Sequence, residues 1–242
     1  PLSAEAEESE SIAFELKRLM AEAELFKLFV PEEYGGTGIK SVFICIAREE
    51  LSKVSNQADD IFAMVGLGTL GISLSGTEAQ KRKHLPRVAR GEVLGSFALT
   101  EPNAGSDIAG IQTRANLIGE CYIVNGEKIF PTCAGIADIW LVFAKTDPAQ
   151  GRRGISTFIV EPNNMPGIHI DRVPMLAGPP EFSVTFSDVA LPKDNLVGME
   201  GDGWQISLST LNIMRVTVGA ACLGIAQAAF QEALSYAQKR IA

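Results

Sequence analysis

The spacing of apolar residues changes twice along the chain. Up to about residue 91 it follows the three-and-four period of amphipathic helices. Apolar side chains within residues 5–28 predict the first helix, and similar patterns over 41–51 and 59–74 predict two more. Thr77 followed by Gln80 is a capping-box signature that opens a basic helix, which we expect to stop at Gly91. This part is therefore expected to be all-helical.

From Gly95 to about Pro192 the apolar residues recur at every second position, the period of strands. Asn125-Gly126 separates two of the runs and predicts a hairpin turn. Short, evenly spaced strands with no helices between them predict an antiparallel barrel or sandwich. The expected strands are Ser96–Thr100, Arg114–Ile118, Tyr122–Val124, Lys128–Pro131, Ile139–Ala144, Ile155–Val160, Ile168–Arg172 and Phe182–Phe186.

After residues 198–201 the helical period returns and predicts one long helix to the end of the chain. Its apolar stripe is a narrow seam that a β domain cannot cover, so we expect it to pack against further helices. The stripe comprises Leu208, Leu211, Arg215, Val218, Cys222, Ile225 and Ala229.

The predicted fold class is therefore α+β, in three parts. Residues 1–93 form an N-terminal helical domain, residues 94–198 a middle antiparallel β-barrel or sandwich domain, and residues 199–242 the long helix of an incomplete helical bundle.

Composition narrows the class of partner. The 242 residues are 46% hydrophobic and 21% charged, as is usual for globular proteins. A formal net charge of −8 argues against nucleic acid or an anionic membrane surface as main partner. We expect no membrane span, because no run of about 18 apolar residues occurs, and the acidic N-terminus has the wrong charge for a signal or transit peptide.

The cysteines and histidines do not form a metal motif. Four cysteines are scattered with no C-x-x-C pair, so we expect them to be reduced and buried. The two histidines, His84 and His169, share no local pattern. Neither a zinc site nor a local His-based triad is predicted.

Residues 66–71, Gly-Leu-Gly-Thr-Leu-Gly, match the GxGxxG pattern of dinucleotide-binding folds. That motif needs a strand before it, a full helix after it and an acidic residue ending the next strand. Gly76 stops the following segment after five residues, and a basic helix comes next. We therefore interpret the glycines as close packing between helices. The alternative is that the pattern binds a dinucleotide, in which case the protein would be an NAD-dependent dehydrogenase.

The stretch from Gly95 to Asp107 is the strongest candidate for a binding site. A predicted strand ends there in a polar turn that contains Pro102, Asn103 and Ser106. Such a turn presents clustered backbone N–H groups, hydroxyls and a carboxylate, which suit a polar ring or a phosphate. A surface turn rich in turn-forming residues is the other interpretation.

Several motifs in one order resemble the acyl-CoA dehydrogenase family over nearly the whole chain. They are Val30-Pro31-Glu32-Glu33-Tyr34-Gly35-Gly36, Leu99-Thr100-Glu101-Pro102-Asn103-Ala104-Gly105-Ser106-Asp107, Asn125-Gly126-Glu127-Lys128, Phe143-Ala144-Lys145-Thr146-Asp147, Gly201-Asp202-Gly203-Trp204 and Leu223-Gly224-Ile225-Ala226-Gln227-Ala228-Ala229.

The resemblance implies an FAD site. In similar proteins the strand before the polar turn lies against the flavin, which makes Phe97, Leu99 and Thr100 its neighbours. Phe130-Pro131-Thr132 is similar to a Trp-Ile-Thr segment, which implies that Phe130 covers a ring face and that Thr132 hydrogen-bonds near the reactive N5. Arg240 is similar to an arginine that reaches the FAD pyrophosphate of a neighbouring subunit.

The resemblance also implies a substrate site. Ser106 matches a position placed for the FAD pyrophosphate or for the pantetheine of an acyl thioester. Asn212 and Arg215 stand where the family contacts CoA, and the acyl pocket is expected along Ala63, Met64 and Leu67. The core, turn or solvated-surface roles that such residues often have are the alternatives.

The catalytic residue of the family is missing at the matching positions. The usual glutamate lies in a C-terminal helical domain beyond this sequence, and some relatives place it immediately before the arginine that Arg215 matches. Met214 occupies that position and cannot accept a proton. The 175–179 segment also lacks the family's arginine and serine. We expect Glu101 to be structural, so no catalytic residue is assigned and the isolated chain is expected to be inactive.

The implied function of the parent protein is FAD-dependent α,β-dehydrogenation of an acyl-CoA, or carrier-protein, thioester to the trans-2-enoyl thioester. The implied partners are electron-transfer flavoprotein or another acceptor and further copies of the chain, as a homodimer or homotetramer. The implied compartment is a bacterial cytoplasm or a mitochondrial matrix. A flavin- or acyl-CoA-binding subunit that lacks catalysis or depends on a partner is the alternative.

Overall fold

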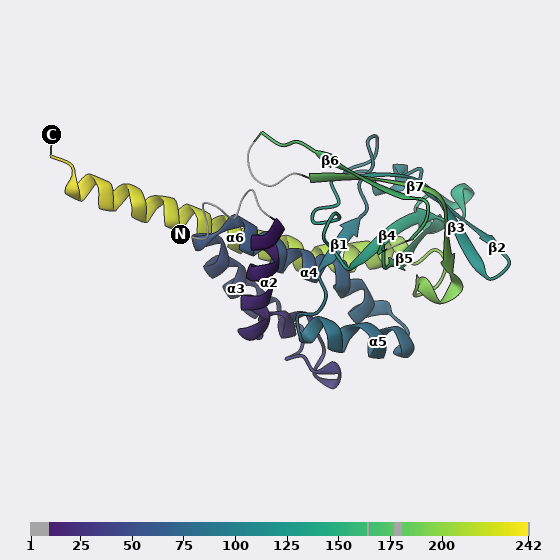
Figure 1. The fold of residues 1–242 in the computed structure, drawn as a ribbon, viewed down its shortest axis with the longest axis horizontal. Coiled ribbons are helices and arrows are strands. Elements are labelled where there is room, and N and C mark those ends of the chain that lie inside the picture. Colours follow the sequence, from purple (N-terminus) through teal and green to yellow (C-terminus); the bar gives the residue numbers. More distant parts are fainter. Residues whose placement is uncertain (1–9, 164, 177–180, 242) are drawn as a thin grey trace.

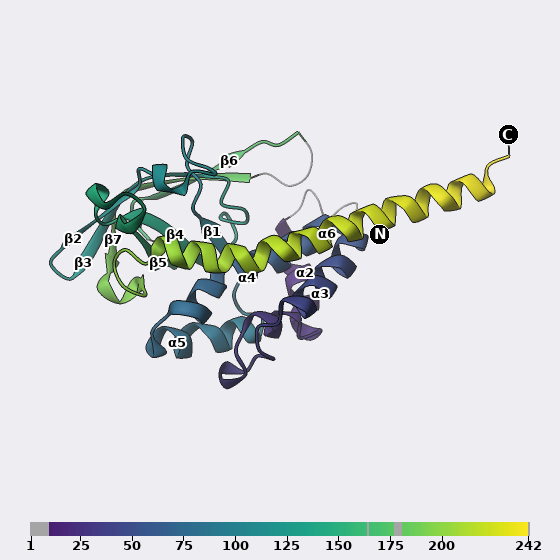
Figure 2. The same cartoon turned by 180° about the vertical axis from the view of Figure 1, so that it is seen from behind.

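The computed structural model describes residues 10–163, 165–176 and 181–241. Helices gather on one side of the molecule and a curved β-sheet on the other, as Figure 1 shows. One long helix, α6 (Gly203–Lys239), runs along both parts and projects beyond them. Figure 2 shows from behind that this helix passes beside the sheet at one end and beside α3 further along. The arrangement confirms the predicted fold class.

Four α-helices precede the sheet among residues 10–94. They are α2 (Glu10–Glu22), α3 (Ser41–Val54), α4 (Asn56–Ser75) and α5 (Glu78–Ala89). Short 3-10 turns at Leu25–Phe29 and Glu32–Tyr34 follow α2, so the helix expected over 5–28 ends at Glu22, and residues 5–9 lie outside the described part. The predicted capping box is confirmed, because Thr77 and Gln80 each bond the other's backbone N–H.

Helix α4 is the centre of this part, and its glycines face neighbouring elements at very short range. A Cβ on Gly66 would lie 2.5 Å from the Phe29 ring, and one on Gly71 would lie 2.7 Å from Leu141. A Cβ on Gly68 would lie 2.5 Å from the amide nitrogen of Ser96 on β1 (Gly95–Ala98). The GxGxxG pattern is therefore interior helix, and its interpretation as close packing is confirmed.

The β part is one eight-stranded sheet in the order β6-β7-β3-β2-β4-β5-β8, with β1 paired to β4. Most pairs are antiparallel as predicted, but β1 and β2 each run parallel to β4. The other strands are β2 (Arg114–Ile118), β3 (Cys121–Ile129), β4 (Ile139–Lys145), β5 (Ile155–Val160), β6 (Ile168–Val173), β7 (Glu181–Pro192) and β8 (Leu196–Val197).

The hairpin turn predicted at Asn125-Gly126 is wrong. Both residues lie inside β3, where a bulge shifts the register between Val124 and Gly126. The Asn125 side chain pairs across to β7 instead, since it donates to the Asp188 carboxylate and accepts from the Asp188 N–H, both at 2.9 Å. The turn between β2 and β3 falls at Gly119, whose φ of +61° suits a glycine. Cross-strand pairing thus overrides the local turn signal.

Helix α6 buries a face made largely of small residues. Thr217, Ala221 and Gly224 lie against α3, and a Cβ on Gly224 would lie 2.2 Å from the Glu49 carbonyl oxygen. The predicted apolar stripe lies beside this face and is exposed from Arg215 onward. The exposed large apolar side chains on the helix are Val216, Val218, Leu223, Ile225, Phe230, Leu234 and Tyr236.

The structure changes the expectation for the cysteines. Cys222 is exposed and the other three cysteines are half-buried, so the prediction that all four are buried is wrong; all four are free thiols.

By length and composition alone, α4 and α6 could each cross a membrane, but 78% of the apolar window of α4 is buried inside the protein and 22% of that of α6. Among the described residues no cluster of three or more His, Cys, Asp or Glu side chains could hold a metal.

His84 on α5 is a buried base without a hydrogen-bond partner. Its side chain is only 2% exposed, and its Nδ1 atom has no partner among the described residues. Burial, assisted by the charge of Lys83, lowers the pKa of His84 to about 4. The folded protein therefore holds this imidazole in its neutral form at pH 7.

We predict that Gly68→Ala destabilises the fold by about 1–3 kcal/mol or more, because the added methyl group overlaps the β1 backbone. Gly219→Ala on α6 is the matched control, since a Cβ there meets no atom within 4 Å and gains up to about 1 kcal/mol of helix propensity. Urea unfolding of both variants measures the difference. Equal stabilities would contradict the close contact between α4 and β1.

We also predict that His84 makes the protein acid-sensitive. Its folded-state pKa of about 4 lies below the ordinary value of 6.5, so between these pH values the unfolded chain binds a proton that the folded chain does not. The stability is complete above pH 6.5 and falls by about 2–3 kcal/mol toward pH 4. His84→Phe should flatten this part of the unfolding profile, and His169→Phe is the control for loss of an exposed histidine. An unchanged slope in His84→Phe would refute the assignment.

Candidate functional site

The end of β1 and the segment that follows β3 lie side by side. The Thr100 carbonyl accepts a hydrogen bond from the Ile129 N–H at 2.9 Å, and the Ser96 hydroxyl donates to the Thr132 carbonyl at 2.8 Å. The structure therefore brings the predicted residues Phe97, Leu99 and Thr100 next to Phe130 and Thr132. Segments 30 residues apart in sequence form one wall.

The second of these segments is strained. Phe130 and Cys133 both have left-handed backbone conformations, with φ of 61° and 65°. Residues with a side chain pay about 1–3 kcal/mol for such a conformation, and they concentrate at functional sites. Phe130 is also 47% exposed. The fold thus holds an aromatic ring at the surface at some cost in stability.

The wall carries free hydrogen-bond donors. Neither the N–H nor the hydroxyl of Thr100 has a partner among the described residues, although the residue is half-buried. Phe97 is half-buried beside it and packs its ring 4.8 Å from that of Phe143. An aromatic surface with unpaired polar groups at its edge is suited to a flat, polar ring system.

An ion pair is buried directly behind Thr100. The Lys128 ammonium, fully buried, lies 2.7 Å from the Glu101 carboxylate and donates to the Leu99 carbonyl at 3.2 Å. Glu101 also accepts from the backbone N–H groups of Gln112 and Thr113. Burial raises the pKa of Glu101, but the Lys128 charge and these hydrogen bonds outweigh it and hold the pKa below its usual value. Glu101 is therefore structural, as expected, and is no free base.

A second acidic group contacts Thr132. The Thr132 hydroxyl donates to one oxygen of Glu181 at 3.0 Å, while the other oxygen is buried without a partner among the described residues. Burial raises the pKa of Glu181 and raises that of Asp60 on α4 to about 6. Burial, with the charges of Asp60 and Glu181, also raises the pKa of the Cys133 thiol to about 12, so this cysteine is no nucleophile at neutral pH.

The residues expected along the acyl pocket lie on α4. Ala63 and Met64 are buried, Leu67 is half-buried, and the Met64 carbonyl faces Gly95 at the start of β1. This places the helix immediately behind the strand that leads to Thr100. The structure therefore brings Met64 close to the start of β1.

The remaining predicted residues are spread over the surface. Ser106 is exposed in the turn after β1, and Asn212 and Arg215 are exposed on α6. Arg240 lies at the far tip of α6, where it bonds the Tyr236 hydroxyl at 2.6 Å, and Figure 2 shows this end well away from the sheet. Within one chain the structure does not bring Arg240 to the wall. Residues 177–179 of the altered segment lie outside the described part.

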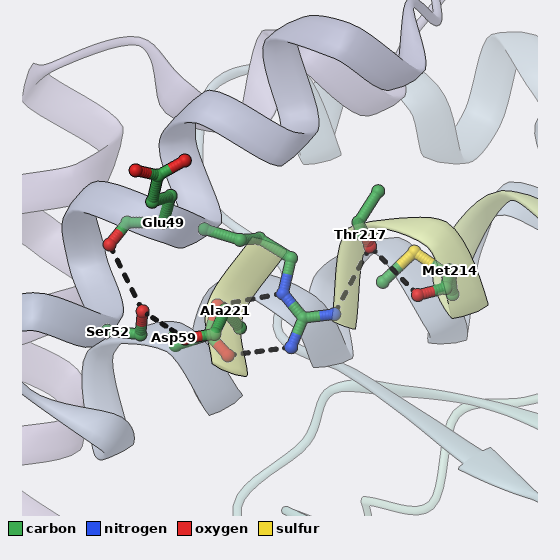
Figure 3. A network of polar contacts seen from close by, with 7 residues as sticks. Glu49, Ser52, Asp59, Met214, Thr217 and Ala221 are labelled. Carbon is green, nitrogen blue, oxygen red and sulfur yellow. Dashed lines mark hydrogen bonds and ion pairs between the residues drawn. The ribbon is translucent and has the colours of Figure 1, made fainter. Parts of the chain in front are cut away.

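A buried network joins α3, α4 and α6 near position 214 (Figure 3). Arg48 pairs with both Asp59 oxygens, at 2.8 and 2.6 Å, and donates to the Thr217 hydroxyl at 3.2 Å. That hydroxyl donates in turn to the Met214 carbonyl at 2.9 Å. The Met214 side chain is only 4% exposed, so a buried thioether occupies the position expected for an alternative base.

Sequence reasoning missed Arg48, Asp59, Asp60 and Glu181 as members of buried networks. A signal existed for the aspartates, because two adjacent carboxylates directly precede the long apolar part of a helix. No comparable signal marked Glu181, whose neighbours are set by contacts between the sheet and α4.

Sequence profiles of acyl-CoA dehydrogenases match all three parts of the chain. The N-terminal domain profile matches residues 1–92, the middle domain profile 96–189 and the C-terminal domain profile 201–242. The chain belongs to the acyl-CoA dehydrogenase family.

Individual relatives agree with this assignment. An acyl-CoA dehydrogenase of Bacillus subtilis is 41% identical over 97% of the chain and 63% of its own length. Butyryl-CoA dehydrogenase from Megasphaera elsdenii has a TM-score of 0.90 and 35% identity, over 99% of this chain and 63% of that one. An acyl-CoA dehydrogenase from Bacillus anthracis, solved with FAD, has a TM-score of 0.85 and 35% identity, over 96% and 41%. The chain thus spans less than two thirds of these relatives.

We predict opposite effects for the two adjacent aspartates of this acyl-CoA dehydrogenase family member. Asp59→Asn removes the charge that Arg48 pairs with inside the protein and should cost about 3–5 kcal/mol. Asp60→Asn should instead stabilise the fold by about 1–2 kcal/mol at pH 7, because burial disfavours the charged form of Asp60.

The pH dependence of the stability of Asp60→Asn shows whether burial of the charge causes the expected stabilisation. The folded-state pKa of Asp60 is raised from 3.8 to about 6, so its ionised form opposes folding above pH 6 and the cost disappears as the pH falls below 3.8. The advantage of Asp60→Asn in urea unfolding should therefore shrink from pH 7 to pH 4. A constant advantage over that range would exclude burial of the charge as its origin.

Proposed function

We propose that the protein is an FAD-dependent acyl-CoA dehydrogenase that converts an acyl-CoA thioester to the trans-2-enoyl thioester. The observation that carries the proposal is the free N–H and hydroxyl of Thr100 beside the exposed Phe130 ring. The solved relative with bound FAD supports the choice of cofactor.

The wall fits a flavin. Thr100 would supply two donors that have no partner among the described residues, Phe130 would supply an aromatic face, and Phe97 and Leu99 would supply apolar contact. Thr132 would help to hold the ring, with its hydroxyl proton directed to Glu181. Bound FAD supplies the acceptor for a hydride from the β-carbon of the substrate. The side chains of this chain orient the ring and exclude water from it.

The substrate lies between the wall and the helices in this proposal. Ala63, Met64 and Leu67 pack the acyl chain, since they lie on the part of α4 whose Met64 carbonyl faces Gly95 of β1. Exposed Ser106, Asn212 and Arg215 contact the pantetheine and CoA. Polarisation of the thioester carbonyl in a dry pocket is what makes its α-proton acidic enough to remove.

Proton removal needs a residue that we do not assign. Met214 has no basic group, and the Glu101 carboxylate is occupied by Lys128 and two backbone N–H groups. We therefore propose that this stretch of chain alone does not turn over, and that the parent protein supplies the base. We further propose a homodimer or homotetramer in which Arg240 reaches the FAD of a neighbouring subunit, with electron-transfer flavoprotein or another acceptor as redox partner.

The buried Met214 and the exposed Asn212 favour a second candidate function. In this alternative the protein is a flavin- or acyl-CoA-binding subunit that lacks catalysis or depends on a partner. Anaerobic addition of butyryl-CoA to the FAD-loaded parent protein distinguishes the two. Bleaching of the flavin band indicates a dehydrogenase, while a shifted but unbleached band indicates binding alone.

We predict that the chain binds FAD and that Thr100→Val weakens binding about tenfold, the effect of losing one hydrogen bond from the site. Thr185→Val, a half-buried strand position on β7, is the matched control and should leave the affinity unchanged. Titration of the visible flavin spectrum measures both. An unshifted band in the wild-type chain would overturn the FAD site, and equal affinities of the two variants would remove Thr100 from it.

A further inference from the structure

The buried Lys128 lies where an uncharged side chain would normally be more favourable. It is fully buried, as is most of Glu101, so both charges have lost their hydration. Replacing such a pair with apolar residues is often neutral or stabilising. The contacts of the pair indicate a role other than stability.

The contacts of Lys128 fall on both sides of Thr100. The ammonium group donates to the Leu99 carbonyl at 3.2 Å and to the Glu101 carboxylate at 2.7 Å. On the next peptide, the Thr100 carbonyl accepts from Ile129 and the Glu101 N–H donates to the Ala104 carbonyl, both at 2.9 Å. The carbonyl groups of Leu99 and Thr100 and the N–H of Glu101 are thus engaged, whereas the Thr100 N–H has no partner among the described residues.

The geometry of the peptide bond fixes the direction in which the Thr100 N–H points. The C=O of Leu99 and the N–H of Thr100 belong to one planar trans peptide and point in opposite directions. Because the carbonyl points toward the buried ammonium, the N–H points away from it. A cation on the carbonyl also polarises the peptide, which strengthens the N–H as a donor.

We propose that Lys128 is a positioning residue for the cofactor: it fixes and polarises the Leu99–Thr100 peptide so that the Thr100 N–H donates to an acceptor atom of the flavin ring. The inference rests on the proposed FAD site. Glu101 balances the charge of Lys128 and is held in turn by Gln112 and Thr113. Although the pair is neutral overall, its ammonium is the member that bonds the Leu99 carbonyl, so the polarised Thr100 N–H favours the electron-rich, reduced cofactor over the oxidised one.

Two measurements on the wild-type chain and one double variant test this. In the wild type, the amide proton of Thr100 should shift downfield in NMR spectra and become protected from exchange when FAD is added. The neutral double variant Lys128→Met/Glu101→Gln should bind FAD about tenfold more weakly. Its bound FAD should have a lower midpoint potential, by about 30 mV for a tenfold weaker preference for the reduced form.

The control is Lys193→Met/Glu120→Gln, which removes an exposed lysine–glutamate pair, 2.9 Å apart, from the turns at the edge of the sheet. It should change neither the affinity nor the potential. If the wild type shows no flavin band, the proposed function fails and this inference with it. If FAD binds but the Thr100 amide neither shifts nor gains protection, the inference alone is overturned, whether or not the double variant folds. A folded double variant with wild-type affinity and potential would also overturn it.

Discussion

The backbone contact between α4 and β1 is the constraint on which the rest of the structure depends. A Cβ on Gly68 would lie within 2.5–2.8 Å of Gly95 and Ser96, so only hydrogen atoms separate the helix from the strand. This contact sets the helical part against the sheet. It also puts the apolar side chains of α4 directly behind the strand that leads to Thr100. Both halves of the proposed site, the flavin wall and the acyl pocket, therefore meet at one contact.

Two buried ion pairs complete the arrangement in different ways. Arg48 and Asp59 hold three helices together beside Met214, and Lys128 and Glu101 hold the backbone on either side of Thr100 (Figure 3 shows the first). A buried ion pair contributes little net stability, but it is favourable only when the two side chains keep a specific geometry. The helices and the wall are therefore fixed by directional contacts as well as by apolar packing.

Much of the fold was predictable from periodicity. The strand Ile155–Val160 and the capped helix beginning after Thr77 have the expected positions, because their local pattern and their burial agree. Asn125-Gly126 failed as a turn signal because pairing with Asp188 keeps β3 continuous. The apolar stripe of α6 was expected to be the face that packs against other helices. The small residues beside it form the packed face instead, because they allow α3 to approach the helix closely. The motifs at Thr100 and Thr132 indicated where the candidate site lies. The spacing of residues along the chain could not predict which groups contact one another there.

The sequence by itself determined the α+β organisation, the family resemblance and the absence of a proton acceptor at position 214, because each depends on residue identity or local period. Tertiary structure decided which polar groups are free and which are engaged. Glu101 and Thr100 are neighbours in sequence, yet the Glu101 carboxylate is engaged by Lys128, and the two donors of Thr100 have no partner in the described part of the chain. That difference arises from strands distant in the chain, since hydrogen bonding and burial depend on what the fold places beside each residue.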